Sequence, residues 1–299
     1  MCIRDSADIG RGLQGAVAGV NITIPTGEVG SDPLIKIRGQ VGSISGNNTP
    51  LILLDNVEIP SIQMVNPNDV QSISVLKDAA SSSIYGSKAA FGVILITTKS
   101  GAQSDKFEIS YSNNFSWQDP AKKIEIGGIE ALQYTLDAQT NRREPMPAGG
   151  FWRISPESLE KAIEWQNLYG GKVKWNDPVV YGRDWFYDGK DKYGYRLYDG
   201  AKAMIKNWTP TMTHNLSVNG KSGKTSYNIG LGYLDQSGMS KTAKKDDFKR
   251  YNASVSVTSE INKYITVRAS SIYSDRNKRY PGIGNTTADP WLYLYRWSP

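Results

Sequence analysis

The sequence holds one cysteine and one histidine in 299 residues. Cys2 lies in the opening stretch Met1-Cys2-Ile3-Arg4-Asp5-Ser6, whose codons can spell a transposon-end adapter used in sequencing libraries. We therefore interpret residues 1–6 as an adapter artefact and exclude them from fold reasoning. The remaining chain has no cysteine, which excludes disulfides, thiolate metal sites and cysteine nucleophiles.

Long hydrophobic runs are also lacking. No apolar stretch approaches the roughly 18 residues that a membrane-spanning helix requires, which excludes a helical membrane protein. A membrane β-barrel is not excluded, because its strands alternate and produce no long apolar window. A signal peptide is missing too, but a chain that begins on an adapter allows no conclusion about export.

The positive charge is not concentrated on one surface. The net charge is +6, with basic residues in loops such as the one holding Lys244 and Lys245, where Asp246 and Asp247 follow at once. Such interrupted clusters are typical of solvated loops. We expect no nucleic-acid partner.

No combination of residues indicates catalysis. His214 lies on the apolar side of a predicted strand, and a zinc site needs three or four ligands, so an interfacial position is favoured. Asp184, Asp188 and Asp191 lie in "RDWFYDGKDKYG", but spacings of four and three do not match a calcium loop, and turn chemistry explains them better. We predict no enzyme activity, no cofactor and no metal site.

Lys88 follows Gly86 beside an apolar strand, so a phosphate-binding loop must be considered. Such a loop needs the order strand, glycine-rich turn, helix. Here Asp78 is a good N-cap for a helix over residues 79–85, which Gly86 ends in the left-handed region, and the strand comes afterwards. The order is reversed, and a nucleotide site is disfavoured.

The first third of the chain predicts short mixed elements. "VAGVNITI", "PLIKIRG" and "PLILLDNVEI" read as strands, and glycines and serines separate them. A turn at Asp55-Asn56 follows the last strand, since Asn tolerates left-handed backbone. These features indicate a compact α/β module.

After Gly101 the pattern changes to strict alternation of apolar and small polar residues. Five stretches show it: "KFEISYSNNFSW" (106–117), "TMTHNLSVNG" (211–220), "TSYNIGLGYL" (225–234), "RYNASVSVTS" (250–259) and "YITVRASSIY" (264–273). Strands of about ten residues with one apolar face fit the wall of a membrane barrel. We expect these residues to face lipid: Phe107, Ile109, Tyr227, Ile229, Val255 and Val257. The alternative is a soluble sandwich, whose strands are usually shorter. Short turns alternating with long loops favour the barrel.

Several stretches together resemble the SusC/RagA family of TonB-dependent outer-membrane transporters of Bacteroidota. They are "LQGAVAGV" (13–20), "IKIRG" (35–39), "NTPLILLDNV" (48–57), "NPNDVQSISVLKDAASSSIYGSKAAFGVILITTKSG" (66–101) and "NLSVNGKSGKTSYNIGLGYLDQSGM" (215–239). The resemblance implies a small mixed α/β plug domain (7–102), followed by the N-terminal antiparallel strands of a transmembrane β-barrel (103–299) with a long extracellular loop at about 118–210. It also implies an incomplete barrel, a fragment that lacks the N-terminal extension and the TonB-contacting segment.

The resemblance implies active import of a glycan or peptide across the outer membrane. Expected partners are TonB, a SusD-like lipoprotein lid, the substrate, membrane lipid and lipopolysaccharide. Candidate ligand-binding residues are Ser43, Ser45, Asn47 and Asn48 in a polar glycine-rich loop, and Trp175, Tyr181, Trp185 and Tyr187 in the long aromatic loop. Packing of these aromatics within the loop, or a solvated turn at 39–49, is the alternative for each group. Rival functions are a siderophore- or vitamin-type receptor and a secreted glycan-binding β protein.

Overall fold

The computed structural model describes residues 9–15, 17–23, 28–37, 49–101, 105, 107–120, 127–141, 154–174, 176–190, 192–241 and 243–280. The chain forms two compact units. The first comprises Met1–Gln118, Thr209–Gly238 and Asp246–Tyr280; the second comprises Asp119–Trp208, Met239–Lys245 and Pro281–Pro299. The interpretation of residues 1–6 as an adapter falls on positions the structure does not describe.

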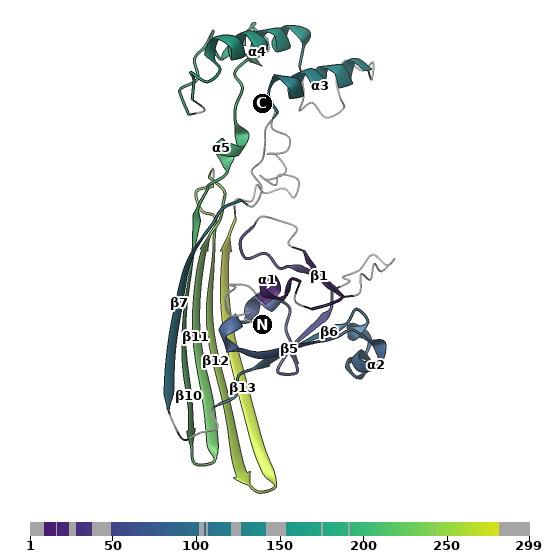
Figure 1. The fold of residues 1–299 in the computed structure, drawn as a ribbon, viewed down its shortest axis with the longest axis vertical. Coiled ribbons are helices and arrows are strands. Elements are labelled where there is room, and N and C mark those ends of the chain that lie inside the picture. The colour runs from purple at the N-terminus through teal and green to yellow at the C-terminus, as the bar shows by residue number, and fades with distance from the viewer. Residues whose placement is uncertain are drawn as a thin grey trace. The chain divides into compact units, whose positions relative to one another are not determined.

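The described residues between 9 and 101, here called the N-terminal module, form two small sheets with short helices (Figure 1). In one sheet β1 (Val20–Thr23) pairs with β2 (Leu34–Ile37). The other has the order β4 (Val57–Glu58), β3 (Leu51–Leu54), β6 (Val93–Thr98), β5 (Val70–Leu76), with β3 and β6 parallel. The helical elements are α1 (Ile9–Leu13), α2 (Ala79–Ser82) and the 3-10 turns η2 (Ile62–Met64), η3 (Pro67–Asp69), η4 (Ser83–Tyr85) and η5 (Ser87–Ala89). A mixed α/β module was expected here.

The larger of two apolar clusters holds most of this module together. β-branched residues on the strands fill it, because alternate side chains of each short strand point to the same face. Its most buried members include Ile22, Ile35, Ile62, Ile94 and Ile96.

The turn at Asp55-Asn56 adopts the left-handed backbone that the sequence predicts, with φ of 47° and 70°. The Asp55 carboxylate accepts a hydrogen bond from the Thr98 backbone N–H at 2.9 Å. The turn thereby ties the end of β3 to the end of β6.

The stretch around Gly86 also follows the prediction in outline. α2 continues into η4, and Gly86 ends it with φ of 72°, a region that glycine occupies readily. Lys88 lies beyond, where its ammonium pairs with Glu58 at 2.7 Å on the surface. The order of elements is that of a helix followed by a strand, so the phosphate-loop alternative finds no support.

The rest of the first unit is a sheet of five long antiparallel strands, here called the strand sheet. They are β7 (Glu108–Gln118), β10 (Thr209–Ser222), β11 (Thr225–Ser237), β12 (Asp247–Asn262) and β13 (Ile265–Arg279), in the order β13-β12-β11-β10-β7. The five predicted strands are present, and all except β7 run longer than the stretches predicted for them. Figure 1 shows them as one curved sheet. The described strands form an open sheet, so the barrel wall stays a prediction.

The two faces of the strand sheet differ as the alternation predicts. Along β12 the polar residues Asn252, Ser254 and Ser256 are buried, while Tyr251 and Val255 are exposed. Over this part of β12 the small polar face is therefore covered by protein and the apolar face is left open, whereas β7 and most of β13 are exposed on both faces.

The second unit contains two packed helices and a short hairpin. Its elements are α3 (Ile129–Asn141), α4 (Pro156–Tyr169), β8 (Trp185–Tyr187), β9 (Lys192–Gly194) and α5 (Gly200–Met204). Helix α4 begins on a side-chain cap, since Ser155 Oγ accepts a hydrogen bond from Ser158 N–H at 3.1 Å. Within the described residues, no helix has the length and apolar character needed to cross a membrane.

Candidate functional site: the contact of the N-terminal module with the strand sheet

Residues 61–69 of the N-terminal module form the segment that meets the strand sheet. Two consecutive 3-10 turns shape it, and each begins on a side-chain cap: Ser61 Oγ accepts from Gln63 N–H, and Asn66 Oδ1 accepts from Asn68 N–H, both at 3.1 Å. Pro67 fits the first position of its turn because its missing N–H would have no partner there. The segment is thus held in one shape with some carbonyls directed outward.

Strand β12 contacts this segment at every second residue. The bonds are Arg250 Nη1 to the Gln63 carbonyl at 2.9 Å, Asn252 Nδ2 to the Met64 carbonyl at 2.7 Å, and Ser254 Oγ to Asp69 Oδ2 at 2.8 Å. A spacing of two places all three side chains on one face of the strand. Successive inward side chains of β12 therefore bond to successive positions along the segment.

Three neighbouring strands add further polar contacts. β10 contributes Asn215, which accepts from Asn66 at 2.9 Å; β11 contributes Asn228, which donates to the Lys99 carbonyl at 3.2 Å; β13 contributes Arg276, which donates to Ser61 at 2.8 Å. Each of these bonds is neutral or involves one charge, and one ion pair, between Lys278 of β13 and Glu28 of the module, joins the two parts as well. The interface is therefore held by many modest hydrogen bonds, and apolar packing is confined to a few residues such as Phe248 against Val29.

Two glycines of β11 are needed for this close approach. A Cβ at Gly230 would lie 2.5 Å from Asp69 Oδ1 and from Ser254 Oγ, and a Cβ at Gly232 would lie 2.5 Å from Asn66 Nδ2. Any larger side chain at these positions forces the module away from the sheet.

Asp69 is the buried acid of this interface, with 7% of its surface exposed. Burial raises the pKa of its carboxyl, and the Ser254 hydroxyl, Lys99 and Arg250 only partly oppose that rise. Its backbone carbonyl also accepts from Lys99 N–H at 2.9 Å. Asp69 thus connects η3, the end of β6 and β12.

A polar cavity of about 50 Å³ lies beside these contacts. Its lining is rich in amides and hydroxyls, including Asn66, Asn114, Thr211, Asn215 and Asn252. Thr211 Oγ1 is buried and has no hydrogen-bond partner in the part of the chain that the structure describes. The volume suits one or two water molecules.

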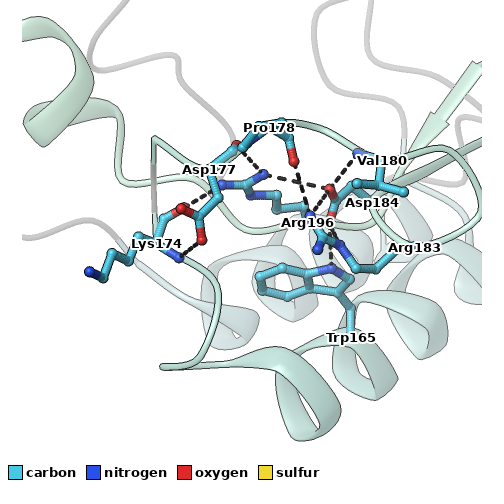
Figure 2. Close-up of polar contacts among 8 residues, drawn as sticks. All are labelled: Trp165, Lys174, Asp177, Pro178, Val180, Arg183, Asp184 and Arg196. Atoms are coloured by element: carbon cyan, nitrogen blue, oxygen red, sulfur yellow. Dashed lines mark hydrogen bonds and ion pairs between the residues drawn. The ribbon is translucent and has the colours of Figure 1, made fainter.

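In the second unit, Asp184 organises the long loop (Figure 2). Its carboxylate accepts from Trp165 Nε1 at 3.0 Å, from Val180 N–H at 2.8 Å and from Arg183, and it pairs with the buried Arg196 at 3.5 Å. Burial alone would raise its pKa, but these donors outweigh burial and lower the pKa to about 2. The sequence interpretation of Asp184 as a loop residue is supported, although its central position was not foreseen.

This network fixes the hairpin β8–β9, which carries Trp185 and Tyr187 of the predicted ligand-binding residues, and Tyr181 lies just before it, bridged to Trp185. The Tyr181 and Trp185 rings meet edge to face at 5.0 Å, and Tyr181 stacks with Phe186 at 6.0 Å. Tyr187 is also exposed. The structure brings Tyr181, Trp185 and Tyr187 into one segment, while Ser43, Ser45, Asn47, Asn48 and Trp175 belong to stretches left undescribed.

No group of three or more potential metal-ligating side chains occurs among the described residues. His214 instead lies in an aromatic row on the exposed face of the strand sheet. Tyr111 OH is 2.7 Å from His214 Nδ1, and the His214 ring stacks on Tyr233, which contacts Tyr251 at 5.0 Å.

Sequence reasoning missed Asp69, Arg250 and the rest of the contact with the strand sheet. One signal was present: Arg250 and Asn252 occupy inward positions of an alternating strand, where a lone sheet facing water would not bury them. Such a pattern indicates that something covers the polar face but does not identify it.

Comparison with known proteins gives the family. The model described as "TonB-dependent Receptor Plug Domain" matches residues 3–93. TonB-dependent receptor P26 of Formosa agariphila is 29% identical over 94% of this chain and 24% of its own length, and TonB-dependent receptor SusC of Bacteroides thetaiotaomicron is 26% identical over 91% and 23%. The RagAB peptide importer in its open-open state superposes with a TM-score of 0.65 at 29% identity, covering 91% of this chain and 29% of that one. These matches support a TonB-dependent receptor of the SusC/RagA type. Receptors of this type lie in the outer membrane, and this chain belongs there. The chain spans about a quarter of the length of these curated relatives.

Proposed function

We propose that this chain is the plug and first barrel strands of an importer that carries a glycan or peptide nutrient through the outer membrane when TonB supplies energy. The observation that carries the proposal is the seating of residues 61–69 on the polar face of the strand sheet. A covered polar face opposite an exposed apolar face is the arrangement of a plug inside a lipid-facing barrel.

The exposed face supports a membrane position for the sheet. The row Tyr111, His214, Tyr233 and Tyr251 crosses four neighbouring strands, and two residues beyond it Lys249 pairs with Asp235 at 3.1 Å. Aromatic rings followed at once by charges are typical of the level where hydrocarbon meets headgroups. The strands then form the first part of the incomplete barrel wall.

Ligand binding is assigned to the loops and the plug. The segment braced by Asp184 presents the exposed Tyr181 and Tyr187 and the half-buried Trp185, and aromatic rings on a rigid element suit a sugar ring or an apolar peptide side chain. Together with Ser43, Ser45, Asn47, Asn48 and Trp175, they make up the proposed ligand-binding set. The long loop would be extracellular in this arrangement.

The proposed partners follow from the same family. TonB would engage a segment outside the present residues, and a SusD-like lipoprotein would close over the bound substrate. Membrane lipid and lipopolysaccharide would contact the outer face. The relatives are named as receptors and importers, and the proposed action is gating, with no covalent chemistry, cofactor or nucleic acid.

The test is uptake by the full-length protein. The substrate is first identified as the glycan or peptide that supports growth of the cells. Cells should then take up this labelled substrate only while the proton gradient and TonB are intact, because the seated module blocks diffusion. Deleting TonB should abolish uptake without changing surface binding of the substrate. Uptake that persists after the gradient is dissipated would indicate a passive pore and refute the proposal.

A further inference from the structure

The contact between the N-terminal module and the strand sheet contains an acid where a neutral group would serve. Asp69 is the single acidic residue of residues 61–69. Its Oδ2 accepts from Ser254 Oγ at 2.8 Å, and its Oδ1 approaches the Cα of Gly230 so closely that no Cβ would fit. An asparagine has the same shape and keeps an acceptor for Ser254.

Ionised, this carboxylate is costly to keep at the interface. A buried charge loses its hydration, and the loss is recovered only where donors and opposite charges suffice. Among the described residues, the charged groups acting on Asp69 are Lys99, on its own module, and Arg250, on β12. Arg250 also donates to the Gln63 carbonyl, and Lys99 donates to the Asn68 carbonyl. Both cations therefore divide their interactions between Asp69 and backbone acceptors.

We propose that Asp69 is a positioning residue for release of the plug: its charged carboxylate holds residues 61–69 in register with β12 while keeping that contact weaker than a neutral side chain would make it. This inference rests on the proposed function, because a contact that must open during import benefits from a limited strength. The hydrogen bond from Ser254 fixes the position of the Asp69 carboxylate, and the charge of that carboxylate lowers the strength of the contact.

The pH dependence has a definite sign. Since burial raises the pKa of Asp69, the seated module favours the protonated acid more than the released module does. The contact is then strongest at acidic pH and loses strength as pH rises through the raised pKa. One linked proton limits the change to about tenfold in the release equilibrium per pH unit.

The experiment measures release directly, in the full-length protein with other cysteines replaced. Ser256→Cys places a thiol on the buried face of β12. Ser256 Oγ has no hydrogen-bond partner among the described residues, so this change should disturb the seat little. Its labelling rate with a water-soluble maleimide is followed from pH 5 to 8 and divided by the rate of an exposed thiol at Ser81, which corrects for thiolate content.

The normalised rate should rise with pH, and Asp69→Asn should make it several-fold lower near neutrality and independent of pH. Ser254→Ala should raise it, because the ionised carboxylate loses its donor. The matched control is Asp78→Asn, which removes one exposed carboxylate of the same module away from the sheet and should leave the profile unchanged. TonB-driven uptake should fall in Asp69→Asn.

Three results would overturn the inference. Faster labelling in Asp69→Asn would mean that the charge strengthens the contact, and an unchanged pH profile would mean that another group titrates. Slower labelling with normal uptake would equally show that this contact does not control release. Labelling requires neither substrate nor TonB, so failure of the uptake proposal is recognised separately by the gradient experiment.

Discussion

Two buried carboxylates of this chain show how local donors decide the effect of burial on an acid. Asp184 receives hydrogen bonds from Trp165, Val180 and Arg183, and the pKa of its carboxyl falls to about 2. Asp69 receives one side-chain bond, from Ser254, and burial prevails, so its pKa rises. The first acid is a structural anchor, whereas the second remains sensitive to its charge state.

At this scale we predict that Asp184→Asn loosens the loop of the second unit. Its lowered pKa stabilises the folded loop by about 2 kcal/mol at neutral pH, and this contribution is lost as pH falls from about 4 toward 2. The substitution also leaves the buried Arg196 without its carboxylate partner. We therefore expect the free energy of unfolding of this loop to fall by roughly 3 kcal/mol in total. Limited proteolysis between residues 170 and 200 should become faster in this variant at pH 7. The exposed Asp188→Asn serves as control, and equal cleavage of both variants would contradict the assignment.

Whole elements were predictable where a periodic pattern extends over many residues. Alternation identified the five strands and their apolar faces. The 3-10 turns of residues 61–69 were not foreseen, because three-residue turns carry no period. Nor was the contact with the strand sheet, since Gln63 and Arg250 lie 187 positions apart and no local pattern links them. Of the candidate ligand residues, only Tyr181, Trp185 and Tyr187 lie in the part of the chain that the structure describes.

The orientation of β12 gives a prediction for this element. Val255 is 41% exposed on the apolar face and Ser254 is 6% exposed on the polar face. In the full-length protein, a lipid-phase thiol reagent should therefore label Val255→Cys and spare Ser254→Cys, because neighbours in a strand point to opposite sides. Equal labelling of the two positions would rule out a membrane wall built from this sheet.

In the molecule as a whole, the binding and the gating that we propose involve different parts of the chain. The aromatic hairpin belongs to the second unit, and the contact between residues 61–69 and β12 belongs to the first. Each is held by its own hydrogen-bond network, around Asp184 in one and around Asp69 in the other. Distinct networks imply that single substitutions can impair one task and leave the other intact.

That separation leads to a prediction for the full-length protein. Tyr187→Ala should weaken binding of an imported oligosaccharide or peptide several-fold, as expected for loss of an exposed aromatic contact worth about 1 kcal/mol, while maleimide labelling of Ser256→Cys stays unchanged without ligand. Ser254→Ala should do the reverse, raising labelling and leaving affinity constant. Tyr134→Ala, at an exposed tyrosine of α3, is the control for loss of a surface ring. If Tyr187→Ala altered labelling in the absence of ligand, the hairpin and the plug contact would be coupled before any substrate arrives, and binding and release would have to be treated as one process.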